Sequence, residues 1–162
     1  MSQYLTFFAR IGDRFIPLAS YSRNTVIYQA FNTVADASYG KVKAMSKDTI
    51  INIRNSFANN LITIEKCIDQ LFTKKREIAT FNNSVEDKLE AIHECDSEIN
   101  NWKDDYDDHC SYMGICNFLI SMIEEIEYKE PEDNLDDVDA KHYIYCGIEA
   151  PIYNIMPNDI EE

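Results

Sequence analysis

Eight side chains of this chain are of the types that bind soft metal ions, five cysteines and three histidines. A structural zinc ion needs four nitrogen or sulfur donors in a tetrahedron and often takes two of them from one short segment. His109 and Cys110 form one such local pair, and His142 and Cys146 form another. One interpretation is therefore a structural zinc site, for which the candidate ligands are His109, Cys110, Cys116, His142 and Cys146.

The alternative is that the cysteines are ordinary core residues. Cys95, Cys110 and Cys116 continue an apolar stripe of helical spacing, in which a thiol packs as a small hydrophobic side chain. An odd number of cysteines without the spacing of a small secreted domain predicts reduced thiols and a cytoplasmic protein. The spacing of the pairs matches no recognised zinc finger, which favours this alternative.

No spacing in the sequence amounts to a catalytic signature. His109 and Cys110 would point about 100° apart on a helix, so they cannot share a proton as base and nucleophile. Glycine-rich phosphate loops are absent, and the cluster from Asp104 to Asp108 lacks the glycine of an EF-hand loop. We therefore predict that the protein is not an enzyme. The enzymatic alternative is a nuclease that holds Mg²⁺ with Asp104, Asp105 and Asp108.

The two halves of the chain carry opposite charge. Residues 1–83 contain 11 Lys and Arg against 6 Asp and Glu, whereas residues 84–162 contain 4 against 23. Such a split does nothing for a core and predicts an external, basic partner. Direct binding of nucleic acid by the acidic half is disfavoured by the sign of its charge. The expected partner-binding residues are Glu94, Glu98, Asp104, Asp105, Asp107, Asp108, Glu124, Glu125, Asp136 and Asp137.

A simpler interpretation is that these carboxylates only keep a long helix soluble. That role would let Lys and Glu alternate in both halves, which the sequence does not show. We therefore keep partner binding as the working hypothesis, with solubility as its alternative.

Hydrophobic spacing predicts the elements that carry these side chains. Residues 4–10 and 14–21 are aromatic-rich runs typical of a β-hairpin, and 142–148 is a similar short strand. Apolar residues recur at three- and four-residue steps over 46–127, with a break at 81–84, which predicts two long antiparallel helices. A kink near Gly114 and a mobile tail after Pro157 are expected.

The predicted fold class is α+β, a small antiparallel sheet with a short helix and a long helical hairpin. The sheet combines the N-terminal hairpin with a C-terminal strand. We expect a single domain, 1–162, with its sheet-containing part in 1–40 and 141–156, the helical hairpin in 46–127 and an acidic loop in 128–140. No window of 18 apolar residues occurs, so no membrane association is expected.

Three N-terminal segments resemble known sequences: YLTFFAR at 4–10, FIPLASYSR at 15–23 and VIYQAF at 26–31. They are similar to small proteins of phages and mobile elements of Gram-positive bacteria. With its small size and acidic second half, the whole chain resembles in character the phage-encoded anti-CRISPR inhibitors, a class without a common motif.

The resemblance implies a non-enzymatic inhibitor in the cytoplasm of a bacterial host. Its partner would be a Cas9-like effector nuclease, whose positively charged channels hold nucleic acid, and the carboxylates would act there as a DNA mimic. A different alternative is a structural protein that self-assembles, because a two-helix hairpin can leave one side exposed to a second copy. The protein is therefore expected to be a monomer or a homodimer.

Overall fold

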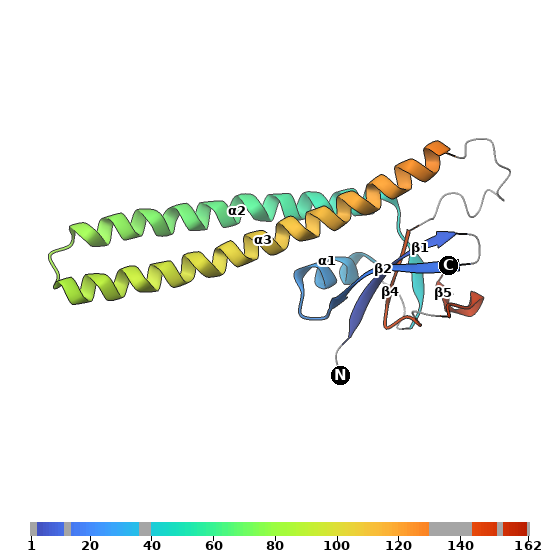
Figure 1. The fold of residues 1–162 in the computed structure, drawn as a ribbon, viewed down its shortest axis with the longest axis horizontal. Helices are drawn as coiled ribbons and strands as arrows, with labels where there is room; N and C mark the ends of the chain where they lie inside the picture. The colour runs from blue at the N-terminus through green and yellow to red at the C-terminus, as the bar shows by residue number, and fades with distance from the viewer. Residues whose placement is uncertain (1–2, 12–13, 36–39, 130–143, 152–153, 162) are drawn as a thin grey trace. The chain divides into compact units, whose positions relative to one another are not determined.

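The computed structural model describes residues 3–11, 14–35, 40–129, 144–151 and 154–161. The fold is α+β, as predicted, with a mixed five-stranded sheet and a long helical hairpin (Figure 1). The elements in chain order are β1 (Tyr4–Ile11), β2 (Arg14–Ser22), α1 (Val26–Ala35), β3 (Val42–Ala44), α2 (Lys47–Thr80), α3 (Val85–Lys129), β4 (Ile144–Ile148), η1 (Pro157–Asp159) and β5 (Ile160–Glu161).

The chain forms two compact units. The sheet unit contains residues 1–53 and 116–162, and the hairpin unit contains residues 54–115. Helices α2 and α3 contribute to both units, and the hairpin unit consists only of their segments 54–80 and 85–115 with the turn between them.

The sheet has the strand order β2-β1-β4-β3-β5. β1 lies between β2 and β4 and is antiparallel to both, with Phe7 opposite Cys146 and Phe8 opposite Tyr145. The predicted N-terminal hairpin and C-terminal strand are therefore confirmed, and the short strand β3 adds a further antiparallel partner to β4.

Both faces of the central strands are covered. Five consecutive residues of β1 and all residues of β4 are buried. In a sheet with one solvent-exposed face, buried and exposed residues would instead alternate along each strand. On one face, the rings of Phe7 and Phe31 of α1 pack edge to face with centroids 4.7 Å apart. On the other, Phe8 packs with Val42 and Tyr145, and the C-terminal segment covers this cluster through Ala150, Ile155 and Ile160.

The expectation of a mobile tail after Pro157 is wrong. Residues 157–159 form a short 3₁₀ helix, and Ile160 begins β5, which pairs in parallel with β3 opposite Val42. The side chain of Ile160 packs against the apolar cluster around Phe8. A strand of two residues has too little periodicity to be recognised in the sequence.

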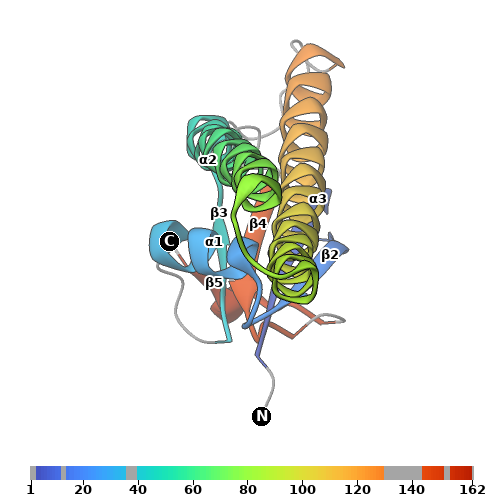
Figure 2. The same ribbon diagram turned by 90° about the vertical axis from the view of Figure 1, so that its left-hand side faces the viewer.

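Side-chain caps mark the starts of the two long helices. The Ser46 hydroxyl accepts a hydrogen bond from the Thr49 amide, and the Ser84 hydroxyl accepts one from the Asp87 amide, each at 3.2 Å. α3 is one continuous helix that includes Gly114, so the helix is not interrupted at the position where a kink was expected. In the hairpin unit the two helices lie side by side and antiparallel (Figures 1 and 2).

Candidate functional site

The seam between the two helices of the hairpin unit is apolar, with one polar interruption. Its buried side chains include Phe57, Ile64 and Ile78 of α2 and Cys95 and Ile99 of α3. These residues recur at the steps that the sequence predicted for an antiparallel pair of helices. The seam fixes which side chains of α3 point away from α2.

The polar interruption of the seam is His109. Its Nδ1 lies 2.8 Å from the Asp105 carbonyl oxygen, and its Nε2 lies 3.3 Å from Nδ2 of Asn60 on α2. These contacts fit a neutral ring whose Nδ1–H donates to the carbonyl and whose Nε2 accepts from the amide. The ring also packs edge to face on Phe57, with centroids 5.8 Å apart. A polar contact of this kind between two helices favours one register of the pair.

The candidate zinc ligands lie in different environments. Cys110 is exposed on α3, whereas Cys116 is buried. Cys146 is buried in β4, where its thiol lies 3.3 Å from Sδ of Met45 and where burial raises its pKa to about 12. That shift opposes the thiolate that a zinc ion needs. Across the described residues, no three His, Cys, Asp or Glu side chains are grouped to hold a metal ion. His142 lies outside those residues, and the zinc site stays a prediction.

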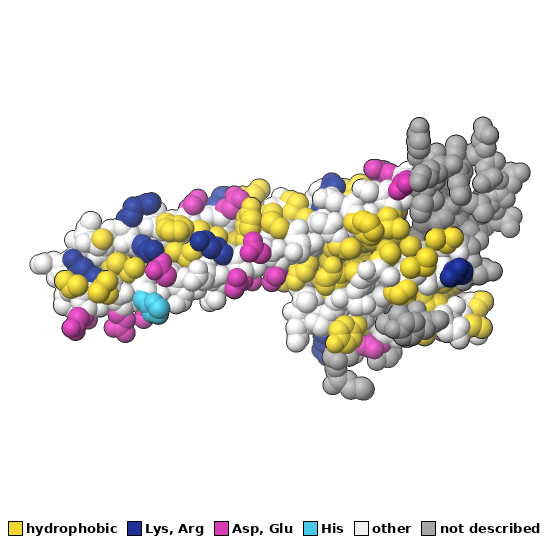
Figure 3. All heavy atoms as spheres, viewed as in Figure 1, with side chains coloured by type: hydrophobic (Ala, Val, Ile, Leu, Met, Phe, Trp, Pro, Cys, Tyr) yellow, Lys and Arg dark blue, Asp and Glu magenta, His cyan; other side chains and the backbone are white. Residues whose placement is uncertain are grey.

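The predicted partner-binding carboxylates of α3 are at the surface. Glu94, Glu98, Asp104, Asp105, Asp107 and Asp108 are all exposed in the hairpin unit, and acidic side chains are visible along it in Figure 3. In the sheet unit, Glu124 and Glu125 are also exposed, and Glu124 pairs with Lys47 at 3.0 Å. Asp136 and Asp137 lie outside the described residues.

Four of these carboxylates form one row along α3. Glu94, Glu98, Asp105 and Asp108 follow one another at steps of four, seven and three residues, which place side chains on the same side of a helix. We call these four residues the acidic row. Their span of 14 residues corresponds to roughly 21 Å at ~1.5 Å per residue. Within the described part of the chain, none of the four forms an ion pair with a basic side chain.

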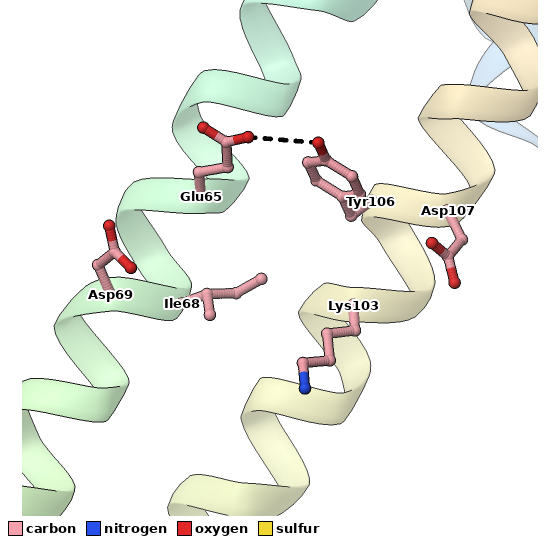
Figure 4. A pocket seen from close by; sticks show the side chains of 6 residues that line it. All are labelled: Glu65, Ile68, Asp69, Lys103, Tyr106 and Asp107. Atoms are coloured by element: carbon pink, nitrogen blue, oxygen red, sulfur yellow. Dashed lines mark hydrogen bonds between the residues drawn. The ribbon is translucent and has the colours of Figure 1, made fainter.

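Asp107 belongs to a different side of α3. Consecutive helical residues are about 100° apart, so Asp105 and Asp107 point about 160° apart around the helix. Asp107 lines a pocket of about 400 Å³ between the helices, shown in Figure 4. The lining residues are Glu65, Ile68 and Asp69 of α2 and Lys103, Tyr106 and Asp107 of α3.

A hydrogen bond crosses this pocket. The Tyr106 hydroxyl donates to Oε1 of Glu65 at 3.3 Å, and Figure 4 shows the two side chains reaching toward each other. This bond, together with the negative charge of Glu65, raises the pKa of the Tyr106 hydroxyl. The pocket combines Lys103 with three carboxylates and the apolar side chain of Ile68, so its net negative charge favours a cationic ligand over an anionic one.

Sequence reasoning missed this pocket because it depends on the register between two distant segments. Glu65 and Asp69 are four residues apart, as are Lys103 and Asp107, so each pair could be placed on one helix face from the sequence. Only the seam determines that these two faces turn to the same side of the hairpin.

Comparison with protein-family models, curated proteins and solved structures finds no match to this chain. Among the described residues, none of the helices combines the length and the apolar character that crossing a bilayer requires. The functional argument therefore depends on the chemistry of the surfaces described above.

Proposed function

We propose that the protein is a non-enzymatic inhibitor that binds a basic nucleic-acid-handling protein through the acidic row. The partner class that this surface fits is a Cas9-like effector nuclease of a bacterial host, the partner that the anti-CRISPR resemblance implies. The single observation that supports the proposal is the acidic row itself, because four exposed carboxylates share one side of α3 without a basic neighbour in the row.

The spacing of the acidic row suits competition with nucleic acid. Three intervals over roughly 21 Å give about 7 Å per charge, compared with about 3.4 Å along one strand of DNA. The acidic row is therefore a sparse imitation of a phosphate backbone. Such a surface attracts lysines and arginines over about one Debye length, which is about 8 Å at physiological ionic strength. The expected consequence is fast association that weakens strongly with salt.

Two lysines of the hairpin unit interact with carboxylates or line a pocket outside the acidic row. Lys75 of α2 pairs with Asp96, which lies on the other side of α3 from Asp105. Lys103 lines the pocket beside Asp107. Both lysines therefore offset charge outside the acidic row.

Two variants with the same net charge test the proposal. The first neutralises the acidic row: Glu94→Gln, Glu98→Gln, Asp105→Asn and Asp108→Asn. The second neutralises four exposed carboxylates of α2 and α3 that lie outside it: Asp48→Asn, Asp69→Asn, Glu77→Gln and Asp107→Asn. Binding of each variant to a purified Cas9-type effector, with and without its guide RNA, is measured by titration at low and physiological salt.

The proposal predicts that the acidic-row variant binds at least tenfold more weakly than wild type at low salt, whereas the control variant changes much less. Guide RNA that already fills the basic channel should reduce binding of the wild-type protein. An equal loss in both variants would show that only net charge matters, and no binding of the wild-type protein to the effector would remove this partner class.

A further inference from the structure

The pocket belongs to a longer apolar strip on the hairpin unit. Along this strip four large apolar side chains are exposed: Ile62 (53%), Phe72 (38%), Val85 (71%) and Leu89 (61%). Steps of three, four and seven residues connect Ile62 and Phe72 with the pocket residues of α2, and Val85 and Leu89 with those of α3. Lys75 joins the two helices on this side, because it pairs with Asp96 and lies over the ring of Phe72.

We call this side of the hairpin the groove face. It consists of Ile62, Glu65, Ile68, Asp69, Phe72, Lys75, Arg76, Val85, Leu89, Asp96, Lys103, Tyr106 and Asp107. Figure 3 shows hydrophobic side chains distributed along the hairpin between basic and acidic ones. Apolar side chains that follow one another on one side of a helix pair, rather than singly, mark a surface that another element covers.

The groove face differs from the acidic row in charge. It contains three basic and four acidic side chains, which leave one net negative charge, whereas the acidic row carries four. A basic partner gains little from a nearly neutral surface. A second copy of this chain, whose net charge is −14, meets less repulsion at such a surface than at the acidic row.

The charges of the groove face are also arranged for self-pairing. Lys75 and Arg76 follow Glu65 and Asp69 on α2 at separations of six to eleven residues, roughly 9 to 16 Å along the helix. A two-fold axis near residue 70 would place the basic segment of one copy opposite the acidic segment of the other. In such an isologous interface each contact occurs twice, and Phe72 would lie close to the axis.

We propose that the groove face binds a second copy of the chain, with the two hairpins antiparallel, so that four helices form one bundle. This arrangement covers the apolar strip and encloses the pocket, as expected for a four-helix bundle whose helices pack in pairs. The acidic rows of both copies stay on the outside, and self-association does not depend on the function proposed for them.

The oligomeric state of the full-length chain tests the proposal. Sedimentation equilibrium over a range of concentrations should show a monomer–dimer equilibrium for the wild-type protein. The double variant Phe72→Lys with Leu89→Lys should weaken the dimer at least tenfold, although it lowers the repulsion between the copies. A matched control, Gln70→Lys with Ser97→Lys, adds the same charge at exposed positions outside the groove face and should leave dimerisation no weaker.

A charge exchange tests the antiparallel arrangement. Arg76→Glu and Glu65→Arg should each weaken the dimer, and the double variant should recover most of the loss because the two positions face each other across the axis. Circular dichroism confirms that each variant is folded. A wild-type protein that is monomeric at every concentration overturns the proposal, as does a dimer that both lysine variants weaken equally. If the double variant dimerises no more tightly than the single variants, the antiparallel arrangement is overturned.

Discussion

The two units of this protein bury their residues in different ways. In the sheet unit, β1 is covered on both faces, and Phe7 and Phe8 are fully buried although they point to opposite sides. In the hairpin unit, a single seam separates the acidic row from the groove face, and even this seam contains the polar contact between His109 and Asn60. The comparison indicates that the sheet unit supplies most of the packing energy, whereas the hairpin unit presents surface.

Removal of a large side chain should show this difference most strongly. Phe8→Ala deletes a fully buried ring from the cluster with Val42 and Tyr145 and should cost about 3–5 kcal/mol of unfolding free energy. Phe72→Ala removes the same atoms from the groove face and should cost less than about 1 kcal/mol in the monomer. Urea denaturation at a concentration where the protein is monomeric measures both. Equal losses would contradict the comparison.

Replacing one glycine in each unit by alanine should change the stability of the protein in opposite directions. A Cβ on Gly147 of β4 would lie 2.6 Å from the Lys41 carbonyl oxygen and 2.8 Å from Cβ of Ala150, so Gly147→Ala should destabilise the protein by about 1–3 kcal/mol. A Cβ on Gly114 of α3 would meet no atom within 4 Å, so Gly114→Ala should stabilise by about 0.5–1 kcal/mol. Thermal unfolding of the two variants measures the shifts, and a stabilised Gly147→Ala protein would show that β3 and β4 are less closely packed.

The buried thiol of Cys146 should make the sheet unit sensitive to alkaline pH. Burial raises its pKa from 9.0 to about 12, so above pH 9 the unfolded chain ionises this thiol while the folded protein keeps it protonated. Its contribution to stability is therefore complete below pH 9 and falls by up to about 1.4 kcal/mol per pH unit between pH 9 and 12.

The measurement for this prediction is the free energy of unfolding of wild type and Cys146→Ala between pH 8 and 11, under reducing conditions. The difference between the two proteins should shrink as the pH rises, because the alanine variant lacks the ionising group. A difference that stays constant with pH would mean that this thiol is more accessible to water than the structure shows. Thiol labelling gives an independent comparison of the two environments. In the folded protein, the exposed thiol of Cys110 in the hairpin unit should react with iodoacetamide, whereas the buried thiol of Cys146 should not.

Much of this fold could be predicted from the sequence because its elements carry strong periodic signals. The long apolar stripes of α2 and α3, with Ser46 and Ser84 as caps, are visible without any structure. The aromatic runs of β1, β2 and β4 are visible in the same way. By contrast, β5 has only two residues, and its pairing with β3 depends on contacts between distant parts of the chain.

The candidate site was predictable only in part, for a related reason. The excess of carboxylates in the second half is a property of composition, and their exposure on α3 follows from the apolar stripe. The division of these carboxylates between the acidic row and the groove face depends on the register of α3 against α2. That register is set by contacts such as Tyr106 with Glu65 and His109 with Asn60, which no local pattern specifies.

The salt dependence of partner binding tests the central claim most directly. The dissociation constant for a purified Cas9-type effector is measured at several salt concentrations for wild type, the acidic-row variant and the control variant of equal net charge. We predict that the logarithm of the affinity falls steeply with the logarithm of the salt concentration for wild type and the control, and much less steeply for the acidic-row variant. Three parallel lines would contradict the claim that this row of carboxylates is the surface the partner contacts.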